Sequence, residues 1–296
     1  MTSVQTPPLP LPLQQSPEFA AACRALGLTV RQAGGGAVRC QVIARRARLV
    51  GRLDYVGRGP VGPDADAEAE VLHRLAGLGG APLIVNAGTV PAGTLRDSGF
   101  WPVMTAATVA LLPLNRPAAM RAGLHQKWRN RLHRAEATRL TVLRRLLARE
   151  DWLLSAEAAQ ARARRYRTPP AALALAYANA NRGAAQVVEV LSPIGAPLAG
   201  VLVLRHGTAA TWQTGHVTEA GKRACAMNLA LWEAMVWLAE QGCHVLDLGT
   251  VNTQDTPGLA HFKLGTGAQA QRLGGSWLHW RGLAPLARRL PLALAA

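Results

Sequence analysis

The clearest pattern of hydrophobic and polar positions lies in the last third of the chain. Short apolar runs predict three β-strands, at residues 185–193, 196–207 and 209–217. The long apolar segment at 221–242 predicts a helix that ends at Gly242. Residues 243–249 predict a buried strand, and residues 270–280 predict a last strand after a polar loop and a short helix. This order indicates an α/β (α+β) fold in which a largely antiparallel meander leads into one central helix and strand.

The first part of the chain alternates short helices and strands. Periodic apolar positions predict helices at 17–27 and 64–79. Apolar runs predict strands within 37–56, 81–88 and 103–114. Residues 117–139, by contrast, predict one long basic helix with Pro117 in its first turn. The pattern therefore changes near residue 115, where we expect one structural unit to give way to another.

The charge of the chain is high and unevenly distributed. The 296 residues carry a formal net charge of +16. Between Arg121 and Arg167 there are thirteen Lys or Arg residues against four Asp or Glu, a local net charge of +9. Such a concentration favours a polyanionic ligand: RNA, a nucleotide-diphosphate conjugate, coenzyme A or an anionic membrane surface. A solvated, arginine-rich surface without a specific ligand is the alternative interpretation.

Cysteine content and hydropathy bear on the compartment. The four cysteines form no CxxC pair and no zinc-ligand spacing with histidine, so we expect reduced thiols and no metal. Residues 1–17 are rich in Pro and Gln and lack the charged and apolar regions of a signal peptide. No run of about 18 apolar residues predicts a transmembrane helix. We therefore expect a cytoplasmic protein, a monomer or homodimer, with at most weak peripheral contact with a membrane.

Four stretches of the sequence resemble one branch of the GNAT acyltransferase superfamily, the FemAB/FemX-like (BioF2-like) transferases. They are LDYVGRGPVGP at 53–63, LHQKWRNRLHRAE at 124–136, the segment 215–249 and PGLAHFKLGTG at 257–267. The resemblance spans about residues 50 to 280 and implies tandem GNAT-like domains with mixed central sheets flanked by helices. We expect a lead-in at 1–17, domains at 18–115 and 116–285, and an amphipathic tail at 286–296. The chain lacks room for the long coiled-coil arm of larger members, and Thr266 stands where an aromatic residue is common.

The resemblance assigns the main catalytic role to Lys263 in HFKLGTG, as a cation that stabilises the oxyanion formed when an amine attacks an activated carbonyl. Gly265 and Gly267 would let backbone N–H groups approach the substrate closely. By the same resemblance, Lys127 and Arg129 would bind the diphosphate or carboxylates of an acceptor. A surface lysine beside a turn and a solvated basic helix face are the respective alternatives.

Further candidates follow from the residues themselves. Asp247 ends a buried strand, where a carboxylate could orient the acceptor amine, take its proton or cap the following loop. His216 is a candidate general base, and Trp212, four residues earlier on the same strand, is expected on the same face. TEAGKRACA precedes the long helix and offers candidate donor-phosphate ligands at its start: Gly221, Lys222 and Arg223.

We therefore expect an amide-forming acyl- or aminoacyltransferase with no permanently bound cofactor. Its co-substrate would be aminoacyl-tRNA or an acyl-CoA thioester, and its acceptor an amine whose identity the sequence leaves open. The alternative is a non-catalytic GNAT fold that binds RNA or an anionic membrane through its basic helix.

Overall fold

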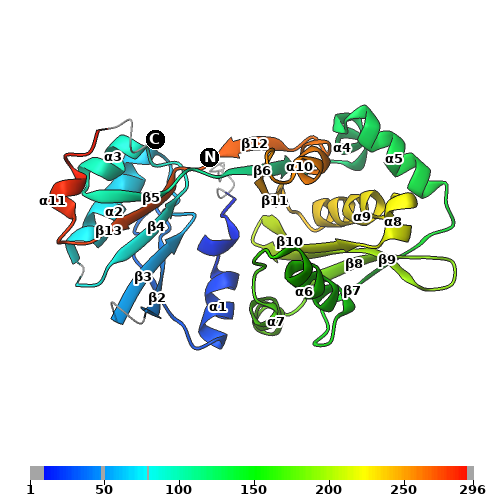
Figure 1. Ribbon diagram of the computed structural model, residues 1–296, viewed down its shortest axis with the longest axis horizontal. Coiled ribbons are helices and arrows are strands. Elements are labelled where there is room, and N and C mark those ends of the chain that lie inside the picture. The colour runs from blue at the N-terminus through cyan, green and yellow to red at the C-terminus, as the bar shows by residue number, and fades with distance from the viewer. Residues whose placement is uncertain (1–9, 48–50, 79, 292–296) are drawn as a thin grey trace, which may run out of the picture. The chain divides into compact units, whose positions relative to one another are not determined.

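The protein folds into two compact units, which are described separately (Figure 1). The computed structural model describes residues 10–47, 51–78 and 80–291. One unit comprises Ala110–Gln269 together with residues 10–13, and the other comprises Gln14–Val109 and the chain after Gln269. The second unit is thus built from two segments that lie on either side of the first unit's main segment in the sequence.

The first unit is organised around a seven-stranded sheet in the order β12-β6-β11-β10-β9-β8-β7. In chain order the strands are β6 (Thr108–Pro113), β7 (Thr141–Leu146), β8 (Ala185–Leu191), β9 (Pro197–His206), β10 (Ala209–Val217), β11 (Val245–Val251) and β12 (Gln269–Arg272). Strands β7 to β10 form an antiparallel meander, whereas β10 and β11 are parallel. The meander and the parallel step match the order expected from the sequence.

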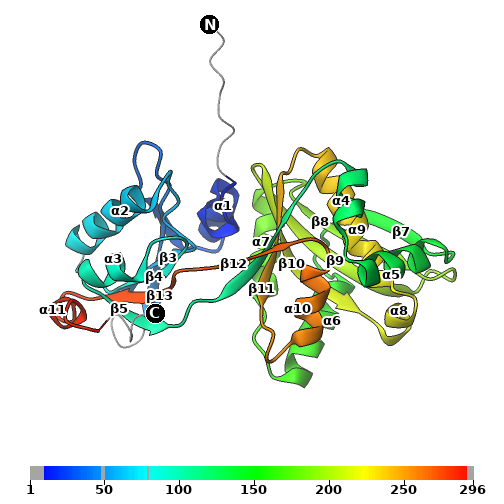
Figure 2. The same ribbon diagram turned by 90° about the horizontal axis from the view of Figure 1, so that it is seen from above.

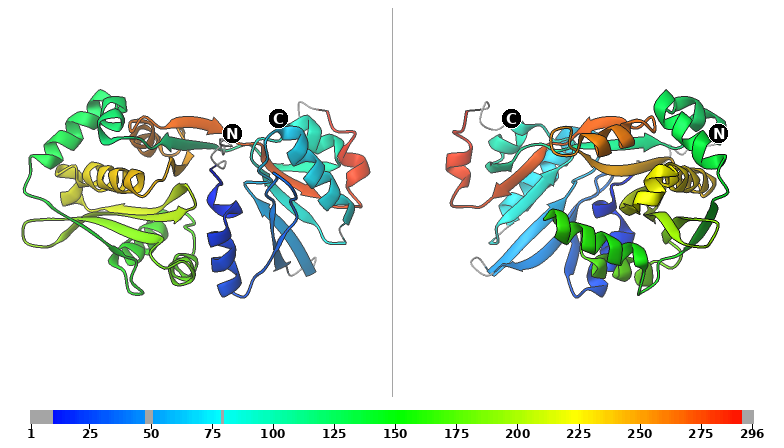
Figure 3. Two further views of the ribbon diagram at one scale, coloured as in Figure 1. Left: turned by 180° about the vertical axis from the view of Figure 1, so that it is seen from behind. Right: turned by 45° about the vertical axis from the view of Figure 1, so that its right-hand side comes forward.

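Helices cover both faces of this sheet. In chain order they are α4 (Pro117–Gly123), α5 (Gln126–Glu136), α6 (Trp152–Arg164), α7 (Ala171–Ala180), α8 (Glu219–Arg223), α9 (Ala226–Glu240) and α10 (Pro257–Leu264). Helix α9 lies along one face, with α5 packed on it, and α6 and α7 lie on the other face (Figures 1 and 3).

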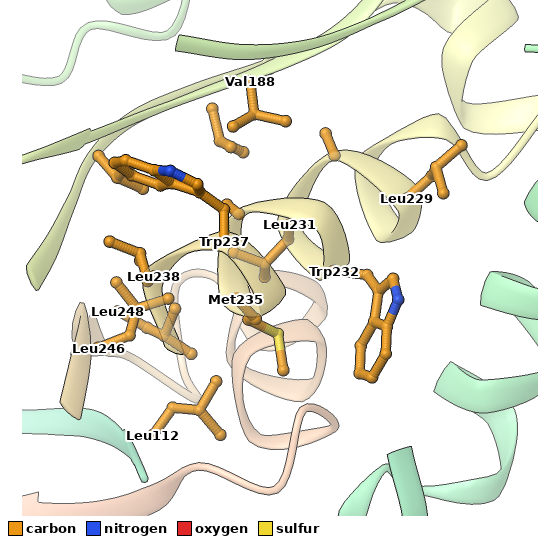
Figure 4. Packing of buried hydrophobic residues seen from close by; sticks show 14 of the residues in the cluster. Leu112, Val188, Leu229, Leu231, Trp232, Met235, Trp237, Leu238, Leu246 and Leu248 are labelled. Atoms are coloured by element: carbon orange, nitrogen blue, oxygen red, sulfur yellow. The ribbon is translucent and has the colours of Figure 1, made fainter. Parts of the chain in front are cut away.

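Helix α9 is apolar on nearly all sides because it is enclosed by the sheet and its neighbouring helices. Figure 4 shows Leu238 beside Leu246 and Leu248 of β11. Trp232 and Trp237 of α9 are 4% and 8% exposed. Burial of this helix therefore supplies much of the apolar packing on this face of the sheet, mainly against β8 and β9.

Two helices that the sequence predicted as continuous are each broken. Residues 117–139 form α4 and α5, separated by extended backbone at Leu124 and His125. The break lets Leu124 pack in the core at 2% exposure, and it lets the His125 amide donate to the carbonyl of Gly265. The helix expected at 221–242 begins instead at Ala226, because Cys225 adopts a left-handed conformation with φ 55°.

The second unit contains a six-stranded sheet in the order β1-β2-β3-β4-β13-β5. Its strands are β1 (Thr29–Gln32), β2 (Gln41–Ala47), β3 (Gly51–Gly57), β4 (Leu83–Ala87), β5 (Phe100–Met104) and β13 (Gly275–His279). Helices α1 (Pro17–Ala25), α2 (Ala65–Leu78), α3 (Ala92–Asp97) and α11 (Ala284–Ala287) accompany it, with the 3-10 helix η1 (Leu13–Gln15) before α1.

Strand β13 differs most from the expected organisation. The sequence placed one strand at 270–280 within a domain at 116–285. Residues 269–272 instead pair in the first unit's sheet, whereas Gly275–His279 pair with β4 and β5 of the second (Figure 2). Trp277 on β13 is 1% exposed and joins the apolar core of that unit. The expected tail at 286–296 overlaps α11 and extends beyond the described residues, as most of the expected lead-in does.

Candidate functional site

A cleft opens where strands β10 and β11 separate. Their parallel pairing covers only Ala209 to Thr211 of β10, opposite Val245 to Asp247 of β11. Beyond this point β10 contains an irregularity between Trp212 and Thr214. Because the two strands diverge beyond this irregularity, space opens between them. Residues of both β10 and β11 line the cleft that results.

The cleft has two lobes that share several lining residues. The first, which we call the cationic lobe, has a volume of about 990 Å³, and the second, the Lys263 lobe, about 660 Å³. Both are lined by Gln160, Arg164, Trp212, Gly215 and Leu259. The first extends toward α5, α8 and the start of α9, and the second toward β11 and the loop before α10. All of these residues belong to the first unit.

Lys263 lies in the second lobe and is only 7% exposed. Its Nζ donates a hydrogen bond of 2.8 Å to the carbonyl oxygen of Thr250 and lies 5.8 Å from the centre of the Trp212 ring. Burial lowers the pKa of Lys263 to about 8, although the carboxylate of Asp247 acts in the opposite direction. A buried lysine with so low a pKa is typical of functional sites.

Asp247, on β11, lies near Lys263 but is not itself part of the cleft wall. It is 6% exposed, and its Oδ1 accepts a hydrogen bond of 2.7 Å from the Gly249 amide, so it caps the turn in β11. The residue is outside the lining of both lobes. Its carboxylate raises the pKa of Lys263 and so acts electrostatically on a residue of the cleft.

The expectation that Trp212 and His216 share a face is wrong. The register of β10 against β9 shifts between Trp212 and Thr214, so one extra residue reverses the alternation of side chains. Trp212 lines both lobes, and its indole ring packs against Gly215. A Cβ atom added to Gly215 would lie only 2.6 Å from that ring. His216 instead contacts Trp152 of α6, with ring centres 6.2 Å apart.

His216 is consequently not one of the residues that line the cleft. Burial lowers the pKa of His216, Glu157 raises it, and Lys222 and Arg164 lower it further. Its Nδ1 is buried and has no hydrogen-bond partner among the described residues. The structure therefore places His216 against α6 and outside the lining of both lobes.

Helix α8 and the start of α9 form one wall of the cationic lobe. Gly221, Lys222 and Arg223, the predicted donor-phosphate ligands, are among the residues that line it. Gly221 is buried, however, and a Cβ there would lie 2.1 Å from the carbonyl oxygen of Leu198, so close packing alone requires glycine. Asn228 also lines this lobe at 5% exposure, and its Nδ2 has no partner among the described residues.

The basic helix α5 contributes different residues from those expected. Lys127 is exposed and lines neither lobe, and Arg129 donates to the carbonyl of Leu124 at 3.1 Å. Arg131 and Arg134, one helical turn apart, line the cationic lobe instead. Together with Arg164, Lys222 and Arg223 they give this lobe five cationic side chains and no lining carboxylate.

Gly265 and Gly267 pack α10 against its neighbours. A Cβ on Gly265 would lie 2.9 Å from Trp128, and Gly267 has φ 90° beside the Gly123 carbonyl. Both are outside the lining of the cleft. Close approach of helices, rather than approach to a substrate, accounts for these glycines.

Several lining residues were not identified from the sequence. Glu157, Gln160 and Arg164 lie on α6 at a spacing of three and four residues, which places them on one face. Tyr166 follows the helix and also lines the Lys263 lobe. The helical spacing was present in the sequence, but the position of α6 beside β10 could not be deduced from it. Among the described residues, no group of three or more His, Cys, Asp or Glu could hold a metal ion.

The comparisons with known proteins agree with this geometry. Residues 118–264, just under half of the chain, match the family described as Acetyltransferase (GNAT) domain. The match covers α4 to α10 and therefore the whole cleft. No curated protein matches the sequence.

Solved structures extend the likeness to nearly the full chain. FemX aligns with 14% identity and a TM-score of 0.73 over 94% of this chain and 96% of that one. L-PGS from Bacillus licheniformis aligns with 13% identity and a TM-score of 0.53 over 94% and 95% of the two chains. The C-terminal domain of a protein described as a lysylphosphatidylglycerol synthetase, from Agrobacterium fabrum, aligns with 16% identity and a TM-score of 0.59. The alignment covers 95% of this chain and 91% of that one.

At these identities the likeness establishes the fold. The predicted α/β fold with two mixed sheets flanked by helices is thereby confirmed. The family match over residues 118–264 and the likeness in fold to FemX are both consistent with the predicted relation to FemX-like transferases of the GNAT superfamily. Within the described part of the chain, no helix is both long and apolar enough to cross a membrane.

Proposed function

We propose that this protein is an N-acyltransferase that moves an activated acyl or aminoacyl group from a phosphate-bearing carrier to an amine. Acyl-CoA and aminoacyl-tRNA both have the required chemistry. The observation that carries the proposal is the position of Lys263, whose buried ammonium lines one lobe of the cleft. In the adjoining cationic lobe, every charged residue of the lining is an Arg or a Lys.

The cationic lobe suits the carrier. Arg131, Arg134, Lys222 and Arg223 offer donors to several phosphate oxygens, and arginine forks match phosphate geometry. Helix α9 begins at the same place with no side-chain cap, so its first backbone N–H groups and its dipole also favour an anion. Asn228 adds a buried amide donor that a bound carrier would satisfy.

The Lys263 lobe suits the reaction itself. When the amine nitrogen attacks the acyl carbon, the carbonyl oxygen gains negative charge, and the ammonium of Lys263 can donate to it. An ammonium has three N–H groups, so one can remain on Thr250 while another reaches the oxyanion. Collapse of the intermediate breaks the bond to the carrier, which leaves with the electron pair and the proton that the amine loses.

Two donor assays test this proposal. The purified protein is incubated with a mixture of amines and either acetyl-CoA or aminoacylated tRNA, and free thiol or deacylated tRNA is measured. We expect release with one donor and at least a 100-fold loss in Lys263→Met, the order expected when a group acting on the oxyanion is removed. Lys127→Met removes the same charge outside the cleft and should retain activity.

Equal activity in Lys263→Met and the unchanged protein would remove the catalytic assignment. If neither donor is consumed and RNA or anionic vesicles bind with a steep salt dependence, the non-catalytic alternative is correct.

A further inference from the structure

A second cavity lies in the unit that is built around the six-stranded sheet. It has a volume of about 320 Å³, and residues of α2, β13 and the segment that contains α11 line it. All its described lining residues belong to this unit, so the cavity shares none with the cleft. Ligand pockets commonly measure about 300–1,000 Å³, so this one suits a small chemical group rather than a whole nucleotide.

The titratable groups that line this cavity are all basic. They are His73, His279, Arg281 and Arg288, and no Asp or Glu occurs among the described lining residues. Neither arginine forms an ion pair with a residue that the structure describes. Cationic side chains that share one cavity repel one another, so this group lacks a counterion of its own.

The surrounding chain offers no carboxylate that is free to serve as this counterion. After Asp255 the sequence contains no Asp or Glu, so neither β13 nor α11 supplies one. Near the other lining residues, Glu70 lies 4.0 Å from Arg74. Asp97 lies 2.7 Å from Arg96. Because both carboxylates already have cationic partners, the cavity favours an anion from outside the chain.

His279 is the buried member of the basic group. It is 7% exposed, whereas the side chains of the other three residues are exposed. Strand β13 lies between β4 and β5, and the His279 ring contacts Phe100 with ring centres 5.2 Å apart. Among the described residues, the imidazole has no hydrogen-bond partner. Buried polar groups are ordinarily hydrogen-bonded, so an unpartnered imidazole in the lining of a cavity indicates a ligand there.

The electrostatics of His279 confirm that the basic groups lie close together. Burial lowers the pKa of His279, and the charges of Arg288, Arg281 and His73 lower it further. A bound anion acts in the opposite direction and favours the imidazolium, which has two N–H donors. Binding of an anion and protonation of His279 would therefore support each other.

We propose that this cavity binds a phosphate group, with His279 at its floor and Arg281 and Arg288 at its rim. Arginine forks match the geometry of phosphate oxygens, and the imidazolium adds a donor from the buried side. The proposal is independent of acyl transfer, because the cleft belongs to the other unit.

Two sources offer such a group: a free phosphate or small phosphate ester, and the headgroup of an anionic lipid. Trp280 and Leu286 follow lining residues directly in the sequence and are 46% and 55% exposed. Exposed apolar side chains beside cations are also what a lipid surface requires. The experiment therefore needs one arm for each source.

The first arm is a titration of the full chain, labelled with 15N-histidine, with inorganic phosphate at constant ionic strength. The imidazole signals of His73 and His279 report on this cavity and not on the cationic lobe, whose lining contains no histidine. Spectra of His73→Gln and His279→Gln assign the two signals. We expect both to shift to saturation with a Kd of about 1 mM or lower.

Arg288→Gln should raise this Kd by at least about 5-fold, because a charge-assisted contact is lost. Arg289→Gln is the matched control, since it makes the same change at the next residue, which is exposed and outside the cavity. Its Kd should stay within about 2-fold of that of the unchanged protein. Circular dichroism verifies that each variant is folded, and equal effects of the two substitutions would overturn the inference.

The second arm is co-sedimentation with phosphatidylcholine vesicles that contain either phosphatidic acid, with its exposed phosphate monoester, or phosphatidylglycerol at matched surface charge. A preference for phosphatidic acid that Arg288→Gln abolishes and Arg289→Gln keeps would identify a lipid headgroup as the source. Equal binding to both vesicles, together with the phosphate-dependent shifts, would identify a free phosphate or phosphate ester. Absence of both the shifts and the preference would overturn the inference.

Discussion

The ammonium of Lys263 donates a hydrogen bond of 2.8 Å to the carbonyl oxygen of Thr250, which joins the last turn of α10 to the end of β11. The bond holds a buried cation at the point where β10 and β11 have separated. Because the surroundings bury the charge and lower its pKa to about 8, folding makes the protonated form costly. This cost gives the site its first testable consequence.

The stability of the protein should rise between pH 8 and pH 10.5, the range between the folded and the ordinary lysine pKa. In this range the unfolded chain binds the proton that the folded chain has lost, so increasing pH favours the folded state. The effect amounts to at most about 3 kcal/mol in the free energy of unfolding. Urea unfolding of the unchanged protein and Lys263→Met, compared at several pH values, measures it.

The difference in stability between the two proteins should change across that range and be constant below pH 8. Lys127→Met, at an exposed lysine outside the cleft, should show the same change in stability between pH 8 and pH 10.5 as the unchanged protein. A constant difference between Lys263→Met and the unchanged protein across the whole range would show that Lys263 has an ordinary pKa.

Gly221 should tolerate no side chain. A Cβ at this position would meet the Leu198 carbonyl oxygen at 2.1 Å, and backbone cannot move as a flexible side chain can. We expect Gly221→Ala to lower the free energy of unfolding by about 2–4 kcal/mol.

Gly258 provides the matched control, because it lines the same cleft within α10 but would meet nothing within 4 Å. Gly258→Ala should be neutral or more stable by up to about 1 kcal/mol, as expected inside a helix. Equal effects of the two substitutions in chemical unfolding would refute the packing role of Gly221.

Arg131 and Arg134 should determine donor affinity. Replacing both with Ala should raise the KM for the donor by about 10- to 100-fold and weaken its salt dependence, since phosphate contacts are lost. Lys127→Ala, on the same helix but outside the cleft, should change the KM little. Steady-state kinetics at two ionic strengths provides the measurement, and a larger effect of Lys127 than of the arginines would place the donor elsewhere.

The sequence predicted most of the elements but fewer of their functional relationships. The order of strands and helices after residue 185 and the position of Lys263 both follow from local patterns and the family resemblance. The face of His216 could not be predicted, because a single extra residue in β10 reverses its orientation. The role of Gly265 was also misjudged, since its neighbour Trp128 is distant in sequence.

Long-range placement explains the remaining differences. Glu157 and Arg164 show ordinary helical spacing, and nothing local indicates that α6 borders a cleft formed by β10 and β11. The pairing of β13 with β4 and β5 connects segments almost two hundred residues apart. Such contacts are determined by the packing of the whole chain rather than by any local pattern.

The pH dependence of kcat, compared between the unchanged protein and Lys263→Arg, tests the catalytic role of Lys263 most directly. A cation on the oxyanion must be protonated, so kcat at saturating substrates should fall above about pH 8 as Lys263 loses its proton. Arginine remains charged in this range, so Lys263→Arg should lose this alkaline decrease, whatever its lower absolute rate. An identical alkaline decrease in both proteins, or a rate that rises through pH 8 only when Lys263 is present, would contradict the account.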